Sequence, residues 1–425
     1  MVVKFILFLT RIAAYFFYPE KELIGMKRLE TNKPLLVCAN HGNAFIDAML
    51  IMAFSKRKYH VLVRSDVFTA KWSNWLLQKW QLIPVYRLRD GIGQLDKNKE
   101  IFDKCIKIFE DNGAIIVFPE ANCFLEKKLR KIHKGSARLA FQAEESANFK
   151  LGLSIVGVGI NYERMRLFGG KIWLSVSNPF GIAHLKNNYQ LDKNEALLEV
   201  TKQIETDIKL NMVELANAKQ EYLWERVLAW TKTSKSFKYA MTVAENIRLE
   251  TEELQDVLKS AVHQFENKLR KIGINRKWLM QHQAISQSKL GLLVFLRLIY
   301  LVFLFPIFLL GLLFHAIPFY LPLAVATAIF KKDREYDASI NITGSVVLLL
   351  FLYIIYAFII YAYLPSIILV GFALLTLLLS GIVAFHYRRN WIALTSAIHY
   401  WKLKKIEKTE LTAQLNLIAE ELAQF

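Results

Sequence analysis

The chain has 425 residues, enough for one large domain with an appendage or for two domains. Its 55 Lys and Arg against 37 Asp and Glu give a formal net charge of +18, which favours nucleic acid or an anionic membrane surface as partner. The sequence carries no nucleic-acid motif and its apolar residues concentrate between positions 292 and 386, so we expect contact with membrane lipids and no nucleic acid.

The chain begins with an apolar stretch, Val2–Phe17, which contains Lys4 and Arg11 and precedes Pro19. No small-residue cleavage site of a signal peptide follows it. We therefore expect residues 1–30 to hold an interfacial helix that seats the next domain on the lipid surface. An ordinary buried first helix is the alternative.

Residues 31–185 alternate between short apolar runs and helix-like patterns. The expected strands are Leu35–Ala39, Tyr59–Val63, Ile83–Tyr86, Ala114–Phe118, Ser154–Ile160 and Lys171–Val176. The expected helices are Phe45–Phe54, Lys71–Gln81, Lys97–Asp111 and Gly135–Ala143. This alternation predicts an α/β domain over residues 31–215, with a mostly parallel sheet flanked by helices.

A polar, helical segment follows the α/β domain. Asp192 with Glu195 predicts a capped helix that continues to about Val213. A second helix, with apolar residues at helical spacing, begins near Thr251 and stops at Gly273. Residues 216–289 are expected to be a helical linker or packing layer, and residues 388–425 an amphipathic helical tail.

Residues 290–387 are predicted to form an α-helical membrane domain of two hairpins. Gly344–Tyr363 and Ser366–Phe385 each hold about twenty apolar residues, which can cross a hydrocarbon core about 30 Å thick. Gly291–Phe330 is long enough for two passes, although its short second half, residues 316–330, could be re-entrant. The basic residues beside these runs are Lys289, Lys331, Lys332, Arg334, Arg388 and Arg389. All of them fall on one side of such hairpins, so we expect an integral membrane protein with its soluble parts on the cytoplasmic face.

A histidine and an aspartate six residues apart, His41 and Asp47, lie where the first expected strand gives way to a helix. Six residues along an ideal helix leave two side chains about 120° apart, so contact requires His41 in the turn and Asp47 reaching back from the helix. The carboxylate would hold one imidazole nitrogen while the other takes a proton from a substrate. His60 and Asp66 repeat this spacing, so the pair alone fits a structural histidine better than a catalytic one.

Three further motifs follow in chain order. One expected strand ends in Arg87, whose guanidinium suits a phosphate, although a solvated arginine is the plainer interpretation. The next buried strand ends in Pro119-Glu120, which places a carboxylate at the sheet edge. Lys134 and Gly135 then open a helix, where a lysine and free backbone N–H groups could bind an anion.

Together these residues resemble the glycerophospholipid acyltransferases, which acylate glycerol-3-phosphate and lysophosphatidate. Four motifs of that family have counterparts here in the same order, over roughly residues 30–215. They are His41…Asp47, Ile83–Arg87, Phe118-Pro119-Glu120 and Ile155–Gly159.

Two departures from the family pattern are visible. His41 and Asp47 are separated by five residues instead of the usual four, with Asn43 two positions after the histidine. This longer form resembles the branch that contains the fungal glycerol-3-phosphate/dihydroxyacetone-phosphate acyltransferases, as does the run Lys134–Arg138. Ala121 replaces the usual glycine after the glutamate, so we expect a differently shaped loop.

The resemblance implies a membrane-bound O-acyltransferase of phospholipid biosynthesis, with glycerol-3-phosphate or lysophosphatidate as acceptor. It implies that His41 is the general base and Asp47 its orienting carboxylate, and that Arg87 and Glu120 bind the glycerol phosphate. Weaker candidates for substrate binding are Lys134, Arg138 and Asn43. The acyl donor is expected to be a thioester, either acyl-coenzyme A or acyl-carrier protein, used as a co-substrate without any cofactor.

Two alternatives remain open. One is an acyltransferase for another lysolipid or amino-lipid head group. The other is a transporter or flippase-like protein, which would need polar residues at mid-membrane depth. The apolar runs offer almost none, and Arg297 lies close enough to one end to snorkel. Three cysteines without paired spacing argue for a reducing compartment, and the scattered histidines imply no metal site.

Overall fold

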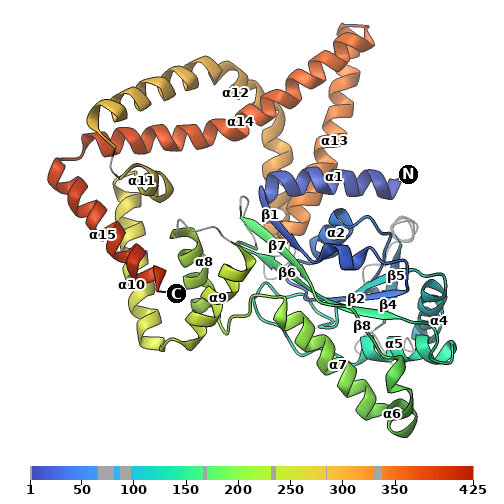
Figure 1. Ribbon diagram of the computed structural model, residues 1–425. Coiled ribbons are helices and arrows are strands. Elements are labelled where there is room, and N and C mark those ends of the chain that lie inside the picture. The colour runs from blue at the N-terminus through green and yellow to red at the C-terminus, as the bar shows by residue number, and fades with distance from the viewer. Residues whose placement is uncertain are drawn as a thin grey trace. The chain divides into compact units, whose positions relative to one another are not determined.

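The computed structural model describes residues 2–65, 81–86, 97–165, 170–230, 236–283, 285–329 and 337–424. The chain divides into two compact units (Figure 1). The first comprises Met1–Ala216, Ser236–Met241 and Lys332–Ser339. The second comprises Asn217–Lys235, Thr242–Lys331 and Ile340–Phe425. Arg87 and most of the expected helix Lys71–Gln81 lie outside the described residues.

A sheet forms the centre of the first unit. In the described part of the chain it has eight strands, ordered β1-β7-β6-β2-β5-β3-β4, with β8 beside β6. Their bounds are β1 Glu20–Ile24, β2 Leu35–Ala39, β3 His60–Arg64, β4 Leu82–Val85, β5 Ala114–Val117, β6 Ser154–Tyr162, β7 Lys171–Val176 and β8 Phe180–Gly181. Only β7 and β8 pair antiparallel, both with β6, so the predicted mostly parallel sheet is confirmed.

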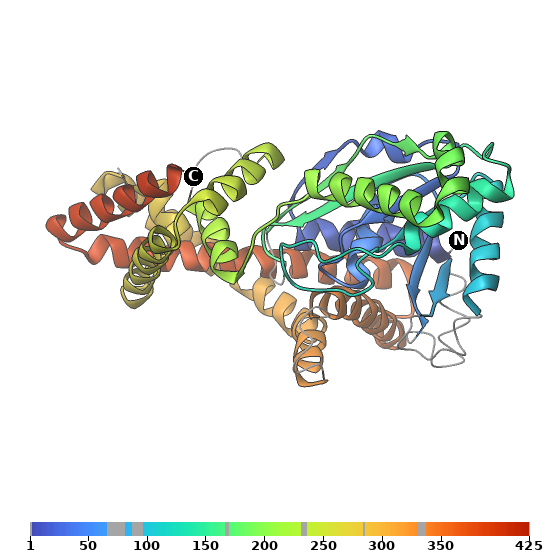
Figure 2. The ribbon, with the colours of Figure 1, turned by 90° about the horizontal axis from the view of Figure 1, so that it is seen from below.

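Helices cover both faces of this sheet (Figures 1 and 2). Their bounds are α1 Val2–Phe17, α2 Phe45–Phe54, α4 Lys97–Glu110, α5 Gly135–Ser146, α6 Lys186–Leu191 and α7 Lys193–Leu210, with short 3₁₀ turns at Met26–Leu29 and Ala183–Leu185. The helices α1 and α2 pack together on one face, and α4 to α7 lie on the other. The predicted cap is present, because the Asp192 carboxylate accepts the N–H groups of Asn194 and Glu195.

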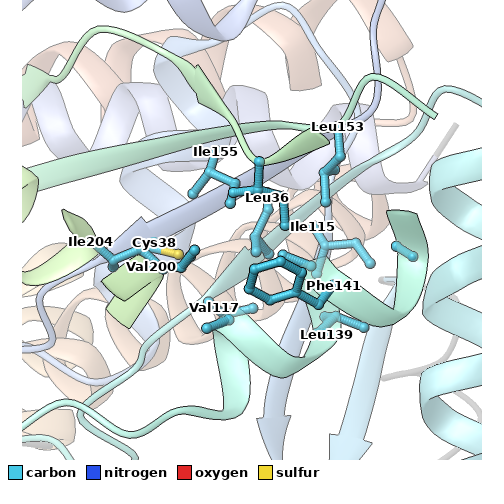
Figure 3. Packing of buried hydrophobic residues seen from close by; sticks show 14 of the residues in the cluster. Leu36, Cys38, Ile115, Val117, Leu139, Phe141, Leu153, Ile155, Val200 and Ile204 are labelled. Carbon is cyan, nitrogen blue, oxygen red and sulfur yellow. The ribbon is translucent and has the colours of Figure 1, made fainter. Parts of the chain in front are cut away.

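The main core lies between the sheet and the helices α5 and α7 (Figure 3). Leu36 and Cys38 of β2 point into it, because side chains along a strand alternate between faces. They meet Phe141 of α5 and Val200 of α7 there. All five residues of β2 are buried, as expected of a parallel strand covered by helices on both faces.

The structure adds two strands that the sequence did not indicate, the short β8 and the edge strand β1. The strand β1 pairs in parallel with β7 at the sheet edge, so the sheet extends before the predicted domain start at residue 31. Its sequence, Glu-Lys-Glu-Leu-Ile, is charged, and charged residues are typical of edge strands that must not pair further. The predicted helix Val2–Phe17 is present as α1, with Ala13 and Ala14 buried and Phe8 and Tyr15 exposed.

The second unit is helical. Its helices include α8 Ala218–Trp230, α10 Glu252–Lys271, α11 Arg276–His282, α12 Gln287–Ile329, α13 Asp337–Tyr363, α14 Ile367–Lys402 and α15 Lys405–Ala423; α9, Phe237–Leu249, begins in the first unit. The helix α10 begins after Thr251, whose hydroxyl accepts the N–H of Leu254, and ends before Gly273, as predicted. The helices α10 and α15 pack against each other, and the Lys268 ammonium donates to the Gln414 side chain at 2.8 Å.

Three helices among the described residues are long and apolar enough to cross a membrane, which indicates a membrane-embedded protein. Their apolar spans are Gln287–Val325, Ile340–Tyr363 and Ile367–Lys402. The break that two passes would need before residues 316–330 is absent, since α12 is one helix of 43 residues with three prolines inside it. Pro318 has no N–H to donate to the carbonyl of Phe314, but the hydroxyl of Tyr356 from α13 donates to that carbonyl at 3.3 Å. A neighbouring helix thus supplies the missing donor, and the first predicted hairpin is a single helix.

Two glycines of β6 let the end of α7 lie directly on the sheet. A Cβ on Gly159 would lie 1.7 Å from the carbonyl oxygen of Asn211, and a Cβ on Gly157 would lie 2.7 Å from the Cβ of Asp207. The side chain of Asn161 donates to the same Asn211 carbonyl at 3.0 Å. A side chain at position 159 would therefore separate β6 from α7.

We predict that Gly159→Ala lowers the free energy of unfolding by about 1–3 kcal/mol, because backbone must move to admit the methyl group. Thermal unfolding of the detergent-solubilised protein measures the effect. Gly135→Ala is the control, since a Cβ there meets nothing within 4 Å. Equal midpoints for the two variants would contradict the close approach.

Candidate active site

The site begins where β2 ends. Asn40, the next residue, continues the pairing with β6 through its side chain, which accepts the N–H of Ile160 at 2.7 Å and donates to its carbonyl at 3.1 Å. His41 follows in the turn before α2. The carboxyl ends of the parallel strands β2, β5 and β6 meet at this edge of the sheet, so residues far apart in sequence converge there.

His41 and Asp47 are in contact. The His41 Nδ1 lies 2.9 Å from the Asp47 Oδ2, and the geometric prediction is confirmed: His41 precedes the helix and Asp47 lies in its first turn. The carboxylate is fully buried, whereas the imidazole is 18% exposed. The imidazole ring stacks on Phe118, with centroids 4.0 Å apart. Because Nδ1 is held by the carboxylate and no described residue bonds to Nε2, Nε2 can accept a proton from a substrate.

Asp47 is held by more than the histidine. Its Oδ2 also accepts the backbone N–H of Asn43 at 2.8 Å, and its Oδ1 accepts the hydroxyl of Tyr162 at 2.5 Å. Asn43 is itself buried and its amide donates to the carbonyl of Met165 at 2.9 Å, so its side chain supports the turn, and its contact with a substrate stays a prediction. Three donors therefore satisfy a carboxylate that has no contact with water.

Glu120 faces the backbone of the histidine turn. Its Oε1 accepts the N–H of His41 at 2.8 Å, and its Oε2 accepts the N–H of Arg130 at 2.9 Å. Burial raises the pKa of the Glu120 carboxyl, and these two hydrogen bonds partly offset the rise. The carboxylate thus ties the loop after β5 to the turn after β2, and its contact with a glycerol phosphate stays a prediction.

The loop after Glu120 keeps a glycine-like conformation despite its alanine. Ala121 has a φ of +59°, in the left-handed region that costs a residue with a Cβ about 1 kcal/mol or more. Ala121 therefore adopts the same left-handed backbone conformation that glycine would favour, but at a cost in strain. Ala44, between His41 and Asp47, also has a positive φ of +43°, and its N–H donates to the Cys123 sulfur at 3.0 Å.

The remaining predicted residues lie around the start of α5. The N–H of His133 donates to the carbonyl of Pro119 at 2.9 Å, which places this helix start beside the Pro119-Glu120 turn. The Lys134 ammonium donates to the side chain of Asn194 at 2.5 Å, and Arg138 is exposed. The structure thus brings His41, Asp47 and Glu120 into one site, with the start of α5 beside the Pro119-Glu120 turn, while Arg87 lies outside the described residues.

Residues 21–161 match the protein-family model described as Acyltransferase. This part of the chain is similar to the domains of that family. It contains His41, Asp47 and Glu120 and reaches from β1 into β6.

One similar solved structure is the crystal structure of the 1-acyl-sn-glycerophosphate (LPA) acyltransferase, PlsC, from Thermotoga maritima. It is 18% identical to this chain, and the match covers 48% of this chain and 79% of that one at a TM-score of 0.34. The comparison with curated proteins gives no match.

Sequence reasoning missed Tyr162, which lies one residue beyond the matched segment. The available signal was its position two residues after the expected strand Ser154–Ile160, whose carboxyl end in a parallel sheet shares an edge with the end of β2. Using that signal requires knowing that β6 is the neighbour of β2, which the sequence did not show.

We predict that Glu120→Gln lowers kcat about tenfold and leaves the acceptor KM nearly unchanged. Glutamine can accept only one of the two N–H groups, so the His41 turn loses one of its ties. Steady-state kinetics with varied acceptor separate the two constants.

The matched control is Glu144→Gln. Glu144 is equally buried and accepts the N–H groups of Leu151 and Leu153, away from the site, so this variant should lose stability and keep kcat. A large rise in acceptor KM for Glu120→Gln would instead indicate direct contact with the substrate.

Proposed function

We propose that the first unit transfers a fatty acyl group from an acyl thioester to a hydroxyl of a glycerol phosphate. The observation that supports this most directly is the His41–Asp47 pair, with its free Nε2, inside a segment similar to the acyltransferase-family domains. The acceptor proposed first is glycerol-3-phosphate, because of the resemblance of the five-residue spacer to that branch. Lysophosphatidate is the alternative.

In the proposed reaction His41 Nε2 removes the proton from the acceptor hydroxyl while the oxygen attacks the thioester carbonyl. Asp47 holds the Nδ1–H and stabilises the imidazolium that forms. The tetrahedral intermediate then collapses, the carbon–sulfur bond breaks, and the leaving thiolate takes the proton from His41. General base assistance of this kind contributes about 10²–10⁴-fold, and no covalent acyl-enzyme is needed.

The charge around the site suits an anionic substrate. Lys131, His133 and Arg138 are exposed near the start of α5, whose free N–H groups also favour anions. We propose that Lys134 and Arg138 attract the phosphate of the acceptor or of the acyl carrier. Arg87 is proposed for the same phosphate on the resemblance alone.

The proposed setting is the cytoplasmic membrane surface. The helix α1 exposes Phe8, Ile12 and Tyr15, which recur at helical spacing and form one apolar stripe. Such a stripe fits insertion among lipid head groups beside the acceptor and the product. Acyl-coenzyme A and acyl-carrier protein are both proposed as donors from the aqueous side.

We predict that His41→Ala lowers acyl transfer by at least about a hundredfold, because the imidazole that takes the acceptor proton is gone. The reaction is followed with purified full-length protein in detergent by the mass of the acylated product. His60→Ala is the control, since His60 repeats the spacing but lies on β3. Near-normal turnover in His41→Ala would contradict the mechanism.

An acceptor screen identifies the substrate. Glycerol-3-phosphate and lysophosphatidate are each supplied with acyl-coenzyme A and, separately, with acyl-carrier protein. We expect the glycerol-3-phosphate product to form faster. Failure of both acceptors with both donors would overturn the proposed function.

A further inference from the structure

Both oxygens of the Asp47 carboxylate take part in hydrogen bonds. Its Oδ2 takes the imidazole of His41 and the backbone N–H of Asn43, at 2.9 and 2.8 Å. Its Oδ1 takes the hydroxyl of Tyr162 at 2.5 Å, the shortest of the three contacts. Tyr162 is the last residue of β6 and is 1% exposed.

The hydrogen bond from Tyr162 to Oδ1 restricts rotation of the carboxylate. A carboxylate held at one oxygen can rotate about its Cβ–Cγ bond and swing that oxygen away from its partner. The Tyr162 hydroxyl opposes that rotation, because the two oxygens move together. Moreover, Tyr162 lies on β6, which pairs with β2, and β2 ends just before His41. The sheet therefore fixes the position of Tyr162 relative to the turn that holds His41.

We propose that Tyr162 is a positioning residue for acyl transfer, holding Asp47 so that its Oδ2 stays directed at His41. This inference rests on the proposed function. A phenol that donates to an ionised carboxylate forms a charge-assisted hydrogen bond, which is stronger in a buried site than in water. It also withdraws part of the negative charge that Asp47 presents to the imidazole.

The phenol remains a donor under working conditions. Burial raises the pKa of Tyr162 well above its usual value, and the neighbouring Asp47 carboxylate raises it further. The titratable groups that act on this cluster are His41 from the turn, Tyr18 after α1, and Cys123 and Glu120 from the loop after β5.

Tyr18 provides a matched comparison. Its ring contacts the ring of Tyr162 with centroids 5.5 Å apart, and it is 2% exposed. The Asp47 carboxylate acts on Tyr18 only through its charge, whereas it accepts the hydroxyl of Tyr162. Replacing either tyrosine by phenylalanine deletes one hydroxyl, but only one of the two changes removes a bond to Asp47.

The test is the kinetics of Tyr162→Phe and Tyr18→Phe in the purified full-length protein, with the acceptor that supports turnover. We expect Tyr162→Phe to lower kcat about tenfold and to leave both KM values within about twofold. Without the donor the dyad holds its proton more tightly, so the acidic limb of the kcat/KM profile should move to higher pH by about half a unit or more. Tyr18→Phe should change neither kcat nor the profile.

A second measurement covers the case in which Tyr162→Phe also weakens the fold. In an Asp47→Ala background the acceptor of the Tyr162 hydroxyl is gone, so adding Tyr162→Phe should lower the residual kcat by less than about twofold. A purely structural role would lower kcat by the same factor in both backgrounds and would leave the pH profile in place. Either of those results overturns the inference.

His41→Ala separates this inference from the function on which it rests. If His41→Ala retains turnover, the proposed mechanism is wrong and Tyr162 has no dyad to position. If His41→Ala is inactive while Tyr162→Phe keeps the wild-type kcat and pH profile, the proposed function stands and only the role of Tyr162 is overturned.

Discussion

The buried carboxylate of Asp47 is the constraint on which the first unit depends. Removing an ionised carboxylate from water costs several kcal/mol unless donors replace the lost hydration. Here the donors come from two places in the sequence: the turn after β2, which holds His41 and the N–H of Asn43, and the end of β6. The buried charge is compensated only when these segments are assembled. The site can therefore form only together with the sheet.

The parallel sheet makes that assembly possible. Because β2, β5 and β6 run in the same direction, His41, Glu120 and Tyr162 leave the sheet at a common edge. Glu120 then binds the backbone of His41, while Asp47 binds its side chain. The Glu120 carboxylate thus holds the backbone of the turn, and the Asp47 carboxylate orients the imidazole ring of His41. A comparison of motifs does not separate these two tasks.

Local patterns predicted much of this unit from sequence alone. The apolar run Leu35–Ala39 and the helix Phe45–Phe54 appear with the expected bounds, and the rotation of an ideal helix correctly placed His41 before Asp47. The charged edge strand β1 was not predicted because it lacks an apolar pattern. The hydrogen bond from Tyr162 to Asp47 depends on the order of strands in the sheet. The two backbone N–H groups that Glu120 binds depend on the path of the loop after β5. Residue spacing in the sequence encodes neither.

Packing between α10 and α15 has a consequence for the membrane-embedded part. The helix α10 precedes the apolar helices and α15 follows them, yet the two contact each other and therefore share one aqueous compartment. The chain between them must cross a bilayer an even number of times or not at all. The helices α12, α13 and α14 consequently do not each cross once, although all three are long and apolar enough. The helix α12 spans about 65 Å at 1.5 Å per residue, twice the thickness of a hydrocarbon core, so it has length to run along the bilayer as well as through it.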